Sequence, residues 1–101
     1  MFVHVAGNLR VTLEEPQDLK RFHVEIPRAV EPEAAARALA GIGRLVGEDN
    51  AWVSESAVRA LPGAPSDAAW RQGWDKMISY AAKSGWIDPT SNEIKAHIVW
   101  K

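Results

Sequence analysis

The sequence predicts a single α+β domain over residues 1–101. Apolar and polar residues alternate near both ends of the chain, over residues 22–26 and 93–100, which is typical of strands. Between these segments, apolar residues recur at the spacing of amphipathic helices. The chain has 101 residues, of which 47% are hydrophobic and 25% charged, so its size and composition fit one globular domain.

The first strands are predicted to form a β-hairpin. Two β-rich runs, residues 2–6 and 9–13, are separated by Gly7-Asn8, a dipeptide typical of two-residue hairpin turns. The loop length sets the register and therefore decides which side chains share a face. We expect His4 to lie in the core with a hydrogen-bonded ring. The expected core face consists of Phe2, His4, Ala6, Leu9, Val11 and Leu13.

A third strand and a first helix are expected next. Residues 22–26 alternate between apolar and polar side chains, which predicts a half-buried strand that stops at Pro27. Pro32 suits the first turn of a helix, and Gly47 suits its end. The apolar stripe of this predicted helix consists of Ala35, Ala38, Leu39, Ile42, Leu45 and Val46.

Two further helices are predicted from their caps. Ser54 is a favourable N-cap for a helix that runs to about Leu61. Ser66 is expected to cap a longer helix, which ends near Lys83 because Gly85 suits the left-handed position after a helix. The apolar face of the longer helix consists of Trp70, Trp74, Met77, Ile78 and Ala81.

The chain is expected to end in a second hairpin. Trp86-Ile87 is a short predicted strand, residues 88–92 have the composition of a turn, and residues 93–100 alternate. One face of the last strand holds Ile94, Ala96, Ile98 and Trp100, and the other holds Lys95, His97 and Val99.

Residues 32–101 resemble the winged helix-turn-helix arrangement. They are predicted to give helices followed by a hairpin, and the segment Tyr80–Asp88 is similar to the helix end, glycine and aromatic-aliphatic pair that open the wing. The resemblance is to the fold and not to a specific family, and it leaves out the N-terminal strands. It implies that the helix over residues 67–83 would enter a DNA groove, with Arg71 and Lys76 as contacts.

The charge balance disfavours nucleic acid as a partner. Twelve Lys and Arg residues stand against 13 Asp and Glu residues, which gives a net charge of −1. Domains that bind nucleic acid usually carry a basic excess, because neutralising phosphates supplies much of their affinity. A winged-helix DNA-binding regulator is therefore an alternative and not the leading hypothesis. No apolar run approaches the length of about 18 residues that a membrane span needs.

Candidate chemistry rests on a few polar residues. His23 and Glu25 share one face of a predicted strand, and His97 lies on the more polar face of another. They would converge as an acid–base or metal cluster if the two strands were neighbours; otherwise they are ordinary surface residues. Tyr80 flanks the helical stripe, where its hydroxyl either lines a pocket or is only structural. No catalytic motif is present, and we expect neither a metal nor a cofactor.

The five tryptophans are the strongest signal for binding. Trp52, Trp86 and Trp100 lie near predicted loops or the chain end, where a half-exposed indole anchors an interface or lines a ligand pocket. The leading hypothesis is therefore a non-enzymatic interaction or accessory module that associates with itself, as a homodimer, or with another protein. The alternative is a small-molecule binder or small enzyme with a pocket between sheet and helices. The absence of cysteine fits a reducing compartment, so we expect a cytoplasmic protein.

Overall fold

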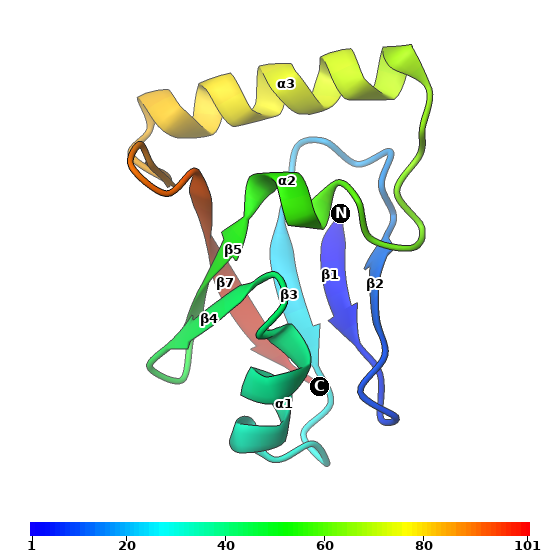
Figure 1. The fold of residues 1–101 in the computed structure, drawn as a ribbon, viewed down its shortest axis with the longest axis vertical. Coiled ribbons are helices and arrows are strands. Elements are labelled where there is room, and N and C mark those ends of the chain that lie inside the picture. Colours follow the sequence, from blue (N-terminus) through cyan, green and yellow to red (C-terminus); the bar gives the residue numbers. More distant parts are fainter.

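The chain is an α+β protein, as predicted, with seven strands in one mixed sheet and three helices. A computed structural model describes residues 1–101 (Figure 1). The elements are β1 (Phe2–Val5), β2 (Val11–Glu14), β3 (His23–Ile26), α1 (Pro32–Leu39), β4 (Gly43–Val46), β5 (Asn50–Ser54), α2 (Glu55–Val58), α3 (Ala68–Lys83), β6 (Ile87–Asp88) and β7 (Glu93–Trp100).

The sheet joins the two ends of the chain through β7. The strand order is β2-β1-β3-β7-β5-β4, and β6 pairs with the start of β7. β1, β3 and β7 are parallel neighbours, whereas β5 and β6 are antiparallel to β7. The last strand of the C-terminal hairpin is therefore also the strand that connects the N-terminal strands to β5 and β4.

The register of the first hairpin differs from the prediction by one residue. The structure pairs Val5 with Val11 and closes the loop with a bond from the Ala6 N–H to the Arg10 carbonyl. Leu9 takes a left-handed conformation, with φ 68°, and this adds a residue to the expected two-residue loop. A shift by one residue turns one strand of a hairpin over relative to the other, so β1 presents the face opposite to the predicted one, while Leu13 of β2 stays in the core as predicted. The buried residues are consequently Val3, Val5 and Leu13, and the expectation of a core His4 was wrong, since His4 lies half-buried on the opposite face.

The first helix is shorter than predicted, because its expected second half is a strand. α1 ends at Leu39, and residues 43–46 form β4, paired with β5. Short apolar runs fit both a helix and a strand, and two glycines in this stretch weaken the helix. Gly43 also lies against the backbone of Trp52, where a Cβ atom would collide.

The helix ends follow local capping chemistry. Ser54 accepts a hydrogen bond from the Ala57 N–H at 3.4 Å, as expected for the N-cap of α2, although α2 ends earlier, at Val58. The cap of α3 is Asp67 and not Ser66, because the Asp67 carboxylate accepts from the Trp70 N–H at 2.9 Å. The predicted C-terminal glycine is confirmed, since Gly85 has φ +81°.

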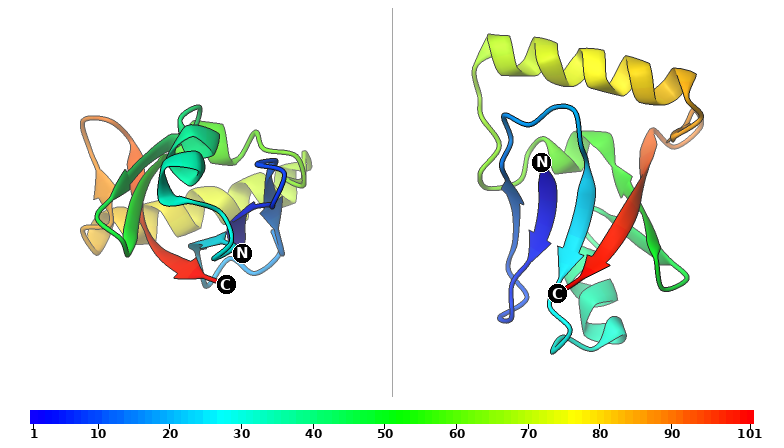
Figure 2. Two further views of the ribbon diagram at one scale, coloured as in Figure 1. Left: turned by 90° about the horizontal axis from the view of Figure 1, so that it is seen from below. Right: turned by 180° about the vertical axis from the view of Figure 1, so that it is seen from behind.

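The apolar core lies on one face of the sheet. Figures 1 and 2 show α1 against this face and α3 across one end of the strands, while no helix covers the opposite face. That opposite face, called here the outer face, carries Phe2, His4, His23, Glu25, Trp52, Lys95, His97 and Val99. None of the three helices combines the length and apolar character that crossing a membrane requires.

The free edge of β2 is covered by the loop between α2 and α3. The Leu13 N–H donates to the Pro62 carbonyl at 2.8 Å, and Gly63 follows with φ +97° against the Leu13 backbone. This contact protects an edge strand that would otherwise offer unpaired backbone groups.

Gly63→Ala is expected to lower the free energy of unfolding by about 1–3 kcal/mol, because alanine is strained at positive φ and its Cβ would collide with Leu13. Gly41→Ala is the control, since its Cβ would meet nothing within 4 Å and its φ is not positive. Urea denaturation of both variants measures the difference. Equal stability of the two variants would contradict the proposed edge contact.

Candidate functional site

Two buried tryptophans fix α3 to the rest of the molecule. The Trp70 indole N–H donates to the Pro16 carbonyl at 2.7 Å, and the Trp74 indole N–H donates to the Glu55 carboxylate at 2.6 Å. The two rings are stacked with their centroids 5.4 Å apart. Both residues belong to the first half of α3, and the helix also contacts β6.

A cleft of about 650 Å³ lies between the second half of α3 and the sheet. It arises from the pairing of β7, whose edge is covered by β6 at residues 93–94 and by β3 at residues 97–100. No strand pairs with the stretch between these two contacts, where the Lys95 N–H donates to the Trp86 carbonyl at 2.8 Å, and α3 lies above it. The cleft is lined by Leu19, Lys20, Arg21, Phe22, Met77, Ile78, Tyr80, Ala81, Trp86, Ile94, Lys95 and His97.

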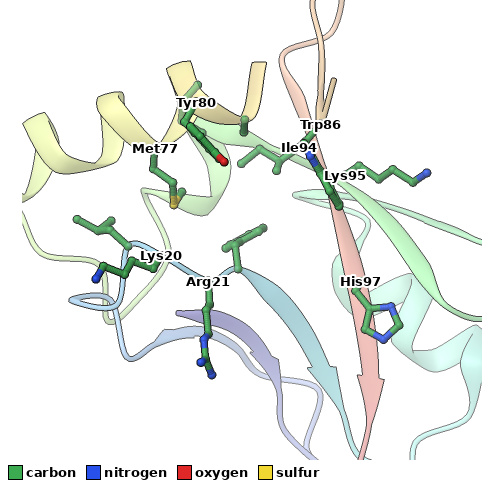
Figure 3. Close-up of a pocket in the computed structure, with 12 residues that line it drawn as sticks. Lys20, Arg21, Met77, Tyr80, Trp86, Ile94, Lys95 and His97 are labelled. Atoms are coloured by element: carbon green, nitrogen blue, oxygen red, sulfur yellow. The ribbon is translucent and has the colours of Figure 1, made fainter. Parts of the chain in front are cut away.

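The interior of the cleft is apolar. Figure 3 shows Met77 and Tyr80 pointing into it from α3 and Ile94 pointing into it from β7. Tyr80 and Trp86 are 74% and 52% exposed, which makes them the most exposed large apolar side chains of the protein. Exposed aromatic rings beside an apolar cavity are typical of a binding site, because they offer large areas at a small entropic cost.

The rim of the cleft is positively charged. Lys20, Arg21 and Lys95 surround it together with His97, and their side chains extend outward from its edge in Figure 3. None of the three cations takes part in an ion pair, and no carboxylate lines the cleft. The rim therefore favours a ligand with negative charge around an apolar centre.

The predicted histidine cluster lies mainly outside this cleft. β3 and β7 are neighbours, with His23 directly opposite His97, and the His23 ring is 2.9 Å from the Glu25 carboxylate. The Phe2 ring stacks on His23 with centroids 5.0 Å apart. No group of three or more His, Asp or Glu side chains is placed to hold a metal ion. His97 is the member of the cluster that reaches the cleft, which it shares with Tyr80.

The other predicted binding residues are dispersed. Trp52 is half-buried on the outer face, and the Trp100 indole donates to the Glu48 carbonyl at 2.7 Å. Arg71 forms an ion pair of 3.2 Å with Asp75 on the surface of α3, where Lys76 is also exposed. Of the three tryptophans proposed for binding, Trp86 alone lines the cleft.

Sequence reasoning missed the loop residues that form one wall of the cleft. Leu19, Lys20, Arg21 and Phe22 lie between β2 and β3. Phe22 was assigned to the predicted strand over residues 22–26, and the other three were given no role. The available signal was a pair of adjacent cations between two large apolar residues. Comparison of the chain with protein-family models, with curated proteins and with solved structures found no match.

Trp74→Phe is expected to lower the free energy of unfolding by about 1–3 kcal/mol, because it leaves the part-buried Glu55 carboxylate without its indole donor. The matched control is Trp86→Phe, whose side chain is 52% exposed and whose effect should stay within about 0.5 kcal/mol. Urea denaturation followed by far-UV circular dichroism measures both. A loss that is the same in both variants would contradict the anchoring role of Trp74.

Proposed function

We propose that this protein is a non-enzymatic interaction module that associates with itself and uses the cleft beneath α3 as its binding site. A cytoplasmic location is part of the proposal. The observation that carries it is the composition of the cleft, which combines an apolar interior, two exposed aromatic rings and a rim with cations but no carboxylate.

The aromatic residues supply the expected binding energy. Tyr80 and Trp86 lie on one side of the cleft and are exposed although each could bury a large area in a complex. Tyrosine and tryptophan are enriched among the residues that dominate interface energies. The net charge of the whole chain is only −1, so the local excess of positive charge at the rim selects a carboxylate-bearing segment without general repulsion between copies.

Binding of a small amphipathic anion is a second candidate, supported by the size of the cleft. Its volume of about 650 Å³ lies within the range of roughly 300–1,000 Å³ that is typical of ligand sites. The Tyr80 hydroxyl and the His97 ring would be the polar groups, whereas His23 and Glu25 do not line the cleft. Decanoate serves as the probe, and a saturable rise in melting temperature that Tyr80→Ala removes would favour this candidate.

DNA binding by a winged helix is the third candidate. It draws on the resemblance of residues 32–101 and on the exposure of Arg71 and Lys76 on α3. The pairing of Arg71 with Asp75 and the balanced charge of the chain give it less support than the cleft gives the interaction module. A gel shift at low salt that Lys76→Ala weakens would favour it.

The double variant Tyr80→Ala/Trp86→Ala is expected to weaken self-association at least about tenfold, since both rings would be buried at the interface. Its melting temperature should change little, because both side chains are exposed in the single chain. Sedimentation velocity over a concentration series measures the association. Leu9→Ala is the control, an exposed apolar residue outside the cleft. Unchanged association of the double variant would exclude the cleft as the interface.

A further inference from the structure

We infer that the segment bound in the cleft is the tip of the β4–β5 hairpin, residues 46–49, from a second copy of the chain. This inference rests on the proposed function and names the partner segment for the same cleft. The tip consists of Val46, Gly47, Glu48 and Asp49. It therefore has one apolar side chain and two carboxylates close together.

The tip is presented to solvent in a fixed conformation. It projects from the body of the molecule between β4 and β5 (Figure 1). The Glu48 carbonyl accepts from the Trp100 indole at 2.7 Å, and the Asp49 carbonyl accepts from the Ile98 N–H at 2.7 Å. These backbone contacts hold the loop, while the Glu48 and Asp49 side chains form no ion pair within the chain. A preorganised loop loses little entropy on binding.

Val46 is the exposed apolar residue whose surroundings match the cleft. The large apolar side chains that remain exposed are Leu9, Val46, Tyr80 and Trp86. Tyr80 and Trp86 belong to the cleft itself. Leu9 precedes Arg10, a cation that the positive rim would repel, whereas Val46 lies two residues before Glu48. The tip therefore offers an apolar anchor and negative charge together.

The unpaired charges of the two surfaces are complementary. The rim offers Lys20, Arg21 and Lys95, and the tip offers Glu48 and Asp49. Exposed ion pairs contribute little to affinity, so burial of Val46, Tyr80 and Trp86 would supply most of it. The charges would fix the orientation and raise the association rate.

The positions of the tip and the cleft allow a symmetric dimer. In Figure 1 the tip lies at the lower left, and the end of α3 that covers the cleft lies at the upper left. Because both are on one side of the molecule but at opposite ends of it, a two-fold axis can place each tip beside the partner's cleft. Two identical contacts then close the assembly as a dimer, without free surfaces for a filament.

Charge reversal tests this inference with two variants. Glu48→Lys/Asp49→Lys reverses the tip, and Lys20→Glu/Lys95→Glu reverses the rim. Each variant alone is expected to dimerise at least about tenfold more weakly than the parent, because like charges then meet at both contacts. An equimolar mixture should recover a dimer of parental affinity that contains one chain of each kind. Glu31→Lys/Glu33→Lys is the control for net charge, since both residues are exposed at the start of α1, Glu31 as its N-cap.

The outcomes separate this inference from the function on which it rests. Sedimentation velocity of the single variants and of the mixture, with one variant fluorescently labelled, identifies the mixed dimer. If the parent dimerises and Tyr80→Ala/Trp86→Ala abolishes the dimer, but tip reversal has no effect, the cleft binds another segment and the inference is wrong. If the parent stays monomeric at every concentration, self-association through the cleft is wrong as well. If both charge-reversal variants lose the dimer and their mixture does not recover it, the inferred pairing of tip and rim is wrong as well.

Discussion

Strand β7 forms hydrogen bonds with three strands that come from both halves of the chain. β3 lies on one side of it and β5 on the other, while β6 pairs with its first residues. Its residues Ile94, Ala96 and Ile98 are buried in the apolar core. Because β3 and β6 cover only part of one edge of β7, the same pairing that completes the sheet also leaves the gap beneath α3.

The binding surface depends on the anchoring of α3 to the rest of the chain. Trp70 and Trp74 bury their rings and satisfy both indole N–H groups within the chain. The second half of the helix turns Met77 and Tyr80 toward the gap, with the Gly85 turn directing the chain back into β6 and β7. A rigid helix over an incompletely paired strand therefore forms an apolar cleft, and the loop before β3 adds positive charge to its rim.

Local sequence patterns predicted the elements whose structure is set locally. The alternation over residues 93–100, the Ser54 cap and the Gly85 helix end are examples, because each depends on neighbouring residues only. The predicted register of the first hairpin was wrong because Leu9 adopts a left-handed conformation, which leucine rarely takes and which its residue type does not indicate. The prediction of a helix over residues 43–46 was wrong because their apolar pattern suits a helix and a strand equally. Their pairing with β5 decides in favour of the strand.

Only part of the candidate site was predicted, because the rest depends on tertiary packing and not on neighbouring residues. Tyr80, Trp86 and His97 were recognised as candidates from residue type and position, and they lie together at the cleft. His23 and Glu25 were grouped with His97 on the condition that their strands were neighbours, and they are, but of these three outer-face side chains His97 alone lines the cleft. Lys20 and Arg21 gained their significance from tertiary packing, since their loop is held beneath α3 by the bond from the Trp70 indole to the Pro16 carbonyl and by the pairing of β3 with β7.

Native-state amide hydrogen exchange tests most directly whether β7 unites the chain into one cooperative sheet. We expect the amides of β3, β5 and β7 to exchange through the same opening, with a free energy equal to that of global unfolding. This expectation would be contradicted if β1–β3 opened at clearly lower free energy while the pairing of β5 with β7 stayed protected, because the N-terminal strands would then form a separate unit.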